Sequence, residues 1–163
     1  MLRIGIGYDI HRLKKGRPLF LGGVRIPFPK GLDGHSDADA LLHAVIDALL
    51  GAAGLPDIGH YFPPSDPRFR GVSSSVMLAQ AAVEIRRAGF RAVNVDSIVV
   101  AEAPKIGPHR AAMRRLIARA LGLPESGVQV KGKTNEGLGA VGRGQAIAAH
   151  AVALLERRRR SSS

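Results

Sequence analysis

Strict alternation of residue types near the N-terminus is the feature that most constrains the fold of this chain. An apolar side chain stands at every second position from Ile4 to Ile10, and the positions between hold two glycines followed by Asp9 and His11. Residues two apart in a strand share a face, so this period predicts a strand over residues 2–13. We expect its apolar face to be buried, and Asp9 and His11 to project together from the other face.

Turn residues and apolar periods divide the remaining chain into further strands and helices. The order of these elements predicts one α+β domain over residues 1–156, in which helices cover a single mixed sheet. Residues 157–163 are predicted to form a basic, disordered tail. The predicted elements are a strand over Leu19–Ile26 bulged at its two glycines, a helix capped by Ser36 and running to about Gly54, an irregular loop over 55–72, a helix over Ser73–Arg87, a strand over Val93–Ala101, a helix over Pro108–Leu121, a strand over Val128–Lys133 and a last helix from Gln145 to about Arg158.

Composition narrows the classes of function. The 163 residues include no cysteine, so disulfides and thiolate metal sites are excluded and any metal must bind His, Asp or Glu. The formal net charge of +11 suits nucleic acid or phosphate-bearing small molecules. Only 4% of the residues are aromatic, which leaves little to stack on bases, so we expect no nucleic-acid partner. No long apolar run follows a basic segment, which predicts a cytoplasmic protein without a membrane partner.

Carboxylates and imidazoles are spaced as they would be in a metal site. Asp9 and His11 share one strand face and suit a divalent metal, although such a pair is also common on exposed strands. Asp39, His43 and Asp47 are spaced by four and therefore share one face of the predicted helix. We predict that Asp9, His11 and His43 bind zinc or another divalent transition metal, with one position left open. The two neighbouring carboxylates are predicted to orient the His43 ring.

Two further segments are candidates for binding phosphate groups. Residues 131–144, KGKTNEGLGAVGRG, combine glycine-rich backbone with three cationic side chains, the Thr134 hydroxyl and Glu136, which suits Mg²⁺ or Mn²⁺ beside a diphosphate. The segment does not match the Walker pattern. Residues 101–109, AEAPKIGPH, lead from a predicted strand into a helix, where backbone groups and Lys105 suit a nucleotide. Taken alone, each segment is equally compatible with a plain turn.

Taken together, these segments resemble one family. The motifs GYDIHRL, GGVRIP, GHSDADALLHAVIDALLGAAGLPDIGHYFP, APK followed by P, and KTNEGLG followed by GRG occur in the order found in 2-C-methyl-D-erythritol 2,4-cyclodiphosphate synthases, across nearly the whole chain. The resemblance implies a phosphorus–oxygen lyase of non-mevalonate isoprenoid biosynthesis. Its substrate is 4-diphosphocytidyl-2-C-methyl-D-erythritol 2-phosphate. The 2-phosphate attacks the β-phosphorus, so that a cyclic diphosphate forms and CMP leaves without a protein nucleophile.

The resemblance also implies a role for each motif. The three predicted zinc ligands polarise the diphosphate through the metal, and Glu136 helps to hold Mg²⁺. His35 and Thr134 are the implied catalytic residues, which stabilise the transition state. The implied substrate contacts are Asp9, His11, His35 and Ser36 near the metal, then Asp57, Ile58, Gly59, Phe62, Pro63, Pro64, Ser65 and Asp66 around the methylerythritol, then Ala101, Glu102, Ala103, Pro104, Lys105, Ile106, Gly107, Gly132 and Lys133 around the cytidine, and finally Thr134, Asn135, Glu136, Ala140 and Arg143.

Family members are homotrimers with active sites between neighbouring subunits, so the resemblance implies a homotrimer with shared sites. Two residues depart from the family pattern. Pro64 stands where some members have an aspartate, which removes one side-chain contact to the substrate. Gln145 stands where some members have a glutamate that pairs with the arginine two residues earlier, so Arg143 lacks that partner. The resemblance places this arginine on the trimer axis, where an isoprenoid diphosphate is expected to bind.

Two other functions are compatible with the residues alone. A metal-dependent phosphohydrolase would use the same ligands to activate water, and would release inorganic phosphate instead of CMP. A basic nucleic-acid-binding module would bind DNA or RNA fragments in a salt-sensitive manner. The identity of the product and the salt dependence of binding separate these functions from the cyclisation.

Overall fold

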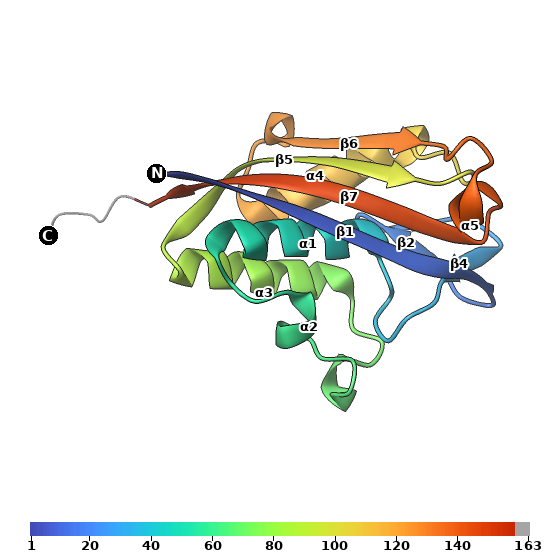
Figure 1. Cartoon of the computed structure of the whole chain (residues 1–163), viewed down its shortest axis with the longest axis horizontal. Helices are drawn as coiled ribbons and strands as arrows, with labels where there is room; N and C mark the ends of the chain where they lie inside the picture. The colour runs from blue at the N-terminus through green and yellow to red at the C-terminus, as the bar shows by residue number, and fades with distance from the viewer. Residues whose placement is uncertain (159–163) are drawn as a thin grey trace, which may run out of the picture.

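The computed structural model describes residues 1–158 and confirms an α+β fold built on one mixed sheet (Figure 1). Five strands lie in the order β4-β1-β7-β5-β6, in which only the pair of β5 and β6 is parallel. A separate hairpin of two short strands lies beside the sheet. The strands are β1 (Leu2–Lys15), β2 (Leu19–Leu21), β3 (Val24–Ile26), β4 (Lys30–Leu32), β5 (Phe90–Val100), β6 (Val128–Lys133) and β7 (Ala146–Arg157).

Helices cover one face of this sheet, and the apolar core lies between them and the strands (Figure 1). The helix α1 packs against β1 and β7, α3 packs against α1 and β5, and α4 packs against β6. The predicted irregular loop over 55–72 contains two short helical turns. The helices are α1 (Ala40–Ala53), α2 (Ile58–Tyr61), α3 (Ser74–Arg87), α4 (Arg110–Leu121) and α5 (Gly139–Gly142), with the 3-10 turns η1 (Pro67–Phe69), η2 (Gly107–His109) and η3 (Glu125–Gly127).

The glycines of β1 allow α1 to lie directly on the strand. A Cβ atom at Gly7 would lie 1.9 Å from the backbone oxygen of Ala44, and one at Gly5 would lie 2.1 Å from that of Ala48. Real side chains do not approach a backbone oxygen so closely, so only glycine fits at these two positions. The helix therefore touches the strand backbone immediately beside Asp9 and His11.

Ser36 was predicted to cap α1, and this prediction is wrong because Asp39 is the cap. The Asp39 carboxylate accepts a hydrogen bond from Leu42 N at 3.0 Å, and the helix begins one residue after it. The same carboxylate accepts hydrogen bonds from Gly22 N at 2.9 Å and Gly23 N at 2.6 Å. These glycines have positive φ and form the turn of the β2–β3 hairpin, so the predicted bulged strand over Leu19–Ile26 is corrected to a hairpin.

The predicted last helix is also wrong, because residues Ala146–Arg157 form the strand β7. Alanine favours helices intrinsically, and the segment is rich in alanine. In the fold, however, it is a central strand, hydrogen-bonded to β1 on one side and to β5 on the other. Its core-facing residues, from Ile147 to Leu155 at alternate positions, are almost fully buried. Small side chains at three of these positions leave room for α1, so tertiary packing overrides the helical propensity.

The apolar face of β1 was predicted to be buried, but it is exposed in the single chain. Ile4 and Ile6 are 72% and 74% exposed, and Tyr8 and Ile10 also face outward. The face covered by α1 is instead the face of the two glycines, Asp9 and His11. The period of two therefore identified the strand, but it did not identify which face the chain buries.

The C-terminal end of the described chain pairs with both neighbouring strands. Arg157 is the last residue of β7, and Arg158 N donates to Gly89 O at 2.8 Å. The predicted basic tail therefore begins within the sheet, and its residues 159–163 lie outside the described part of the chain. Within residues 1–158, no helix is long and apolar enough to cross a membrane.

We predict that replacing Gly7 by alanine strongly destabilises the protein, because the new methyl group overlaps the Ala44 carbonyl of α1. We expect the free energy of unfolding to fall by about 3 kcal/mol or more. This is the upper end of the range for overpacked cores, because backbone atoms must move. Urea denaturation followed by circular dichroism at fixed protein concentration measures it.

Gly51→Ala is the matched control, because a Cβ at Gly51 meets no atom within 4 Å and the residue lies inside α1. That variant should be more stable than the parent by about 0.5–1 kcal/mol, since alanine favours helices over glycine. Equal effects of the two substitutions would contradict the close approach of α1 to β1.

Candidate metal centre and active site

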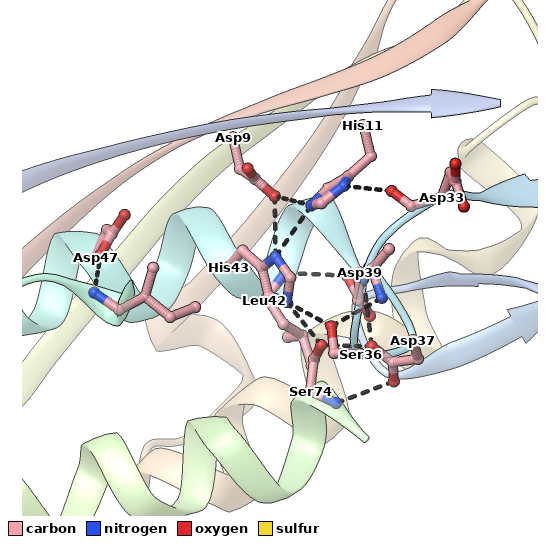
Figure 2. Close-up of polar contacts among 12 residues, drawn as sticks. Asp9, His11, Asp33, Ser36, Asp37, Asp39, Leu42, His43, Asp47 and Ser74 are labelled. Carbon is pink, nitrogen blue, oxygen red and sulfur yellow. Dashed lines mark hydrogen bonds and ion pairs between the residues drawn. The ribbon is translucent and has the colours of Figure 1, made fainter. Parts of the chain in front are cut away.

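Three side chains from two elements converge where α1 crosses β1 (Figure 2). Asp9 Oδ2 lies 2.9 Å from His11 Nε2 and 3.0 Å from His43 Nδ1. The two ring nitrogens lie 3.2 Å apart. Strand periodicity places Asp9 and His11 on one face, and the contact of α1 with the glycines brings His43 against them. The predicted metal ligands are thus brought together.

The donors of this cluster fit a bound cation. His11 Nδ1 lies 2.8 Å from Asp33 O, and because a carbonyl oxygen only accepts, the ring must donate its Nδ1–H there. A neutral His11 ring therefore presents its Nε2 lone pair to the cluster. Three acceptors then point at one another: the Asp9 carboxylate oxygen, the His11 Nε2 lone pair and His43 Nδ1. Such a group of acceptors is stable only around a proton or a metal ion. One oxygen and two imidazole nitrogens suit a transition metal such as zinc.

The charge of the cluster also favours a cation. Burial alone would raise the pKa of Asp9, but when protons rather than a metal occupy the cluster, hydrogen bonds from His11 and His43 outweigh burial and lower that pKa to about 2. Burial alone would lower the pKa of His11, but its hydrogen bond to Asp9 prevails and raises that pKa. Asp9 is therefore ionised at neutral pH and supplies a fixed negative charge at the cluster.

The ring of His43 is held by hydroxyl groups, and the two carboxylates predicted to orient it serve other purposes. His43 Nε2 lies 3.0 Å from Ser74 Oγ and 3.2 Å from Ser36 Oγ (Figure 2). Asp39 caps α1, and Asp47 Oδ1 accepts from Ile58 N at 2.8 Å at the start of α2. Burial is the main cause of a raised pKa at Asp47. Spacing by four placed these carboxylates on one helix face but did not specify what they bind.

A cavity of about 300 Å³ opens beside the cluster and collects residues that the sequence predicted for the substrate. His35 and Ser36 line it next to the metal ligands. A neighbouring cavity of about 770 Å³ shares these two residues and adds Ser65 and Asp66, whose carboxylate is held by Arg68. The other predicted residues that line the smaller cavity are Ile58, Gly59, Phe62 and Pro64, while Asp57 caps α2 and Pro63 lines neither cavity.

Sequence reasoning missed part of this lining. Phe69, Val72 and Met77 supply an apolar wall to the smaller cavity, and Asp33 and Gly34 complete it. One available signal was that Phe69 and Val72 lie within the proline-rich loop over 55–72. Apolar side chains in a surface loop would be exposed to water unless they line a cavity or an interface. Arg17 and Arg70 line the larger cavity, and nothing in the sequence around either arginine indicated that it faces a cavity.

A separate cavity of about 230 Å³ lies where β5 and β6 end, and it brings together the residues predicted for cytidine. It shares no lining residue with the two cavities near the metal cluster. Arg110, at the start of α4, lines it and was not predicted. Ala103 is the predicted residue that does not line it. The predicted lining residues that it contains are Ala101, Glu102, Pro104, Lys105, Ile106, Gly107, Gly132, Lys133 and Thr134.

The loop after β6 is organised by its own side chains. Thr134 Oγ1 donates to Glu136 Oε1 at 2.8 Å, and Glu102 Oε1 accepts from Asn135 N at 2.8 Å. Glu136 has a positive φ of 51° and lies outside the group formed by the three metal ligands. Glu102 therefore shapes the loop that carries Thr134 and Glu136 beside the third cavity. Further along the chain, Ala140 lines another cavity, of about 600 Å³, together with Arg12, Lys30 and Gln145, while Arg143 is exposed.

Comparison with known proteins gives a consistent result. The YgbB family model matches residues 2–156. A 2-C-methyl-D-erythritol 2,4-cyclodiphosphate synthase of Desulfosudis oleivorans is 60% identical over 154 residues, which cover 94% of this chain and 92% of that protein. The synthase of Desulfatibacillum aliphaticivorans is 57% identical over 155 residues, covering 95% of this chain and all of that protein.

Solved structures agree with the sequence comparison. A structure of 2C-methyl-D-erythritol-2,4-cyclodiphosphate synthase in a CDP-bound form superposes with a TM-score of 0.87 at 44% identity, and covers 94% of this chain and 100% of that chain. Both sequence and fold therefore match over almost the full length described. The chain belongs to the YgbB family, among the 2-C-methyl-D-erythritol 2,4-cyclodiphosphate synthases that the motifs of its sequence resemble.

Proposed function

We propose that this protein converts 4-diphosphocytidyl-2-C-methyl-D-erythritol 2-phosphate into 2-C-methyl-D-erythritol 2,4-cyclodiphosphate, with release of CMP and with zinc as the bound metal. The observation that carries the proposal is the convergence of Asp9, His11 and His43 beside a cavity lined by His35 and Ser36. Membership in the family supports the reaction, and the donor set supports the metal.

The reaction is a substitution at phosphorus within one molecule. An oxygen of the 2-phosphate forms a bond to the β-phosphorus, and the bond from that phosphorus to the oxygen of CMP breaks, so CMP leaves with the electron pair. No water is consumed. The contribution of the protein is to hold the two phosphates in line and to neutralise charge, which is the usual basis of catalysis in phosphoryl transfer.

Each part of the site has a task in this scheme. Bound to Asp9, His11 and His43, zinc would supply Lewis acidity toward the diphosphate. His35 lies next to these ligands and donates to phosphate oxygens as charge develops, and Thr134 does the same from the loop after β6. The apolar wall of the smaller cavity packs against the methylerythritol carbon chain and excludes water, which would otherwise compete as the nucleophile.

The cytidine end of the substrate binds at the third cavity. The segment from Pro104 to Gly107 lines it together with Ala101 and Glu102, and Lys105, Lys133 and Arg110 add positive charge for the phosphates. Glu136 would hold Mg²⁺ or Mn²⁺, which would neutralise phosphate charge, because its carboxylate accepts a hydrogen bond from Thr134, a lining residue of this cavity. A solved relative in a CDP-bound form supports a cytidine nucleotide as the ligand.

A homotrimer completes the site in this proposal. Within one chain the metal side and the cytidine side share no lining residue, which is compatible with a site to which neighbouring subunits contribute one side each. The outward face of β1 supplies the contact, because Ile4, Ile6 and Tyr8 form a row of exposed apolar side chains. A contiguous row of large exposed apolar side chains is typical of a protein–protein interface.

An anion site at the trimer axis is part of the same proposal. Arg143 is exposed and Gln145 supplies no negative charge to it. Arg12 and Lys30 line the nearby cavity of about 600 Å³, together with the apolar Ile10 and Leu13. Cationic groups beside apolar ones suit an isoprenoid diphosphate, whose charged head and hydrocarbon chain need both.

The turnover experiment tests the reaction directly. Incubation of the zinc-loaded protein with the cytidyl substrate and Mg²⁺ should release CMP and the cyclic diphosphate in equal amounts. His35→Ala should lower kcat by about 10²–10³-fold, as expected for loss of one group that stabilises developing charge. Phosphorus NMR follows both products. Release of inorganic phosphate without the cyclic product would identify a phosphohydrolase and overturn the proposal.

The metal assignment predicts that His43→Ala lowers zinc affinity by at least about 100-fold, because only two of the three protein ligands then remain to bind the ion. Competition with a fluorescent chelator measures the affinity. His60→Ala is the control, since His60 is an exposed histidine of α2 outside the cluster. Unchanged zinc binding by His43→Ala would mean that the metal binds elsewhere.

The trimer predicts that Ile6→Glu dissociates the assembly, because it places a charge in the centre of the apolar face. Sedimentation velocity should then show a smaller species at micromolar concentration. Val76→Glu is the matched control, since Val76 is 60% exposed on α3, away from the sheet face. If both variants sediment like the parent, the β1 face is not the interface.

A further inference from the structure

A buried hydroxyl and a carboxylate lie behind the ring of His43, on the side away from Asp9 (Figure 2). Ser74 is fully buried at the first position of α3, and its Oγ lies 3.0 Å from His43 Nε2. Asp37 bonds to both polar groups of Ser74: Oδ1 accepts from the hydroxyl, and Oδ2 accepts from the backbone N at 2.9 Å. Neither residue contacts the converging donor atoms of the metal cluster.

The direction of these hydrogen bonds follows from what each group can donate. An ionised carboxylate only accepts, so the single hydroxyl hydrogen of Ser74 is committed to Asp37. Ser74 Oγ can then bond to His43 only by accepting, and the hydrogen must come from Nε2. A neutral His43 ring with its hydrogen on Nε2 carries its lone pair on Nδ1. That nitrogen faces Asp9 Oδ2 at 3.0 Å, inside the metal cluster.

The second hydroxyl near the ring does not fix the hydrogen in this way. Ser36 Oγ lies 3.2 Å from His43 Nε2 and accepts from Ala38 N at 3.0 Å. Its own hydrogen has no committed acceptor in these contacts, so Ser36 is able to donate to the ring as well as to accept from it. Only Ser74, through Asp37, dictates which nitrogen of His43 is protonated.

The backbone around this pair is pinned, which keeps the three groups aligned. Asp37 N donates to Val72 O at 3.1 Å, and Gly71 N donates to His35 O at 2.7 Å. The segment that carries His35 and Asp37 is therefore paired with the segment that leads into α3. Ser74 thus reaches His43 from an element other than the one that supplies Asp37 or the ring itself.

We propose that Ser74 and Asp37 are positioning residues that hold His43 with a free Nδ1 lone pair, and thereby preset the site for its metal. The proposal rests on the metal centre of the proposed function and extends it to two residues that touch neither metal nor substrate. Groups that orient a ligand histidine in this way are worth about 10–100-fold in metal affinity.

The first experiment measures zinc affinity by chelator competition in the full-length protein. Ser74→Ala should bind zinc about 10–100-fold more weakly, because the ring loses the acceptor that holds its hydrogen on Nε2. Ser97→Ala is the matched control: this serine is 1% exposed in β5 and donates to Gln129 O at 2.8 Å, within the sheet. It should bind zinc like the parent, although it also loses a buried hydroxyl.

The second experiment reads the tautomer in the zinc-free protein. Long-range ¹H–¹⁵N NMR at a pH where imidazoles are neutral should show the hydrogen of His43 on Nε2 in the parent. Asp37→Asn keeps the shape of the side chain, and its amide oxygen can still accept from Ser74 N. Its amide group then donates to Ser74 Oγ, which frees the hydroxyl to donate to Nε2. We expect the hydrogen to move to Nδ1 and zinc affinity to fall.

The outcomes separate this proposal from the one it rests on. Failure of the parent protein to bind zinc, or equal binding by His43→Ala, overturns the metal centre itself. Tight binding by the parent together with unchanged affinity and an unchanged tautomer in Ser74→Ala and Asp37→Asn overturns the positioning role alone. A fall in affinity shared equally by Ser97→Ala also overturns it, because a general loss of packing then accounts for the effect.

Discussion

The contact of helix α1 with the backbone of β1 is the constraint on which the rest of the structure depends. It exists because Gly5 and Gly7 place no side chain between the strand and the helix. The next two residues on the same strand face are Asp9 and His11, and the helix that the glycines admit carries His43. One packing contact therefore both joins the helix to the sheet and brings the three side chains together. A larger residue at Gly5 or Gly7 would separate His43 from Asp9 and His11.

Carboxylates near the cluster divide into those that support backbone and those that face the cavity. Asp39 is fully buried, and three backbone N–H groups surround it from the β2–β3 turn and the start of α1. Asp47 similarly begins α2 by accepting from Ile58 N. These bonds fix the segments before and after His43, so that its side chain projects from a well-anchored helix. Asp9 alone among these three carboxylates lies within the cluster.

Local patterns predicted much of this structure, and the failures have a physical cause. The period of two in residues 2–13, the helix over Ser73–Arg87 and the strand over Val128–Lys133 were predicted from local signals, and the structure confirms them. The alanine-rich segment from Ala146 to Arg157 was misassigned because propensity favours a helix, whereas its position between two strands is decided by distant residues. Likewise, spacing by four identified the helix face of Asp39 and Asp47 but not their distant backbone partners. The convergence of Asp9, His11 and His43 was predictable because motif and periodicity agreed.

The two faces of β1 link the metal centre to the proposed assembly. Odd-numbered residues face α1 and the candidate metal cluster, while even-numbered ones from Ile4 to Ile10 face outward. Moving the strand by one residue against its neighbours would exchange the faces, placing isoleucines against α1 and the ligands in the interface. The close approach of α1 to Gly5 and Gly7 opposes this shift, because an isoleucine in either place would overlap the helix backbone. The register of one strand pair therefore determines both where Asp9 and His11 point and which apolar surface is left exposed.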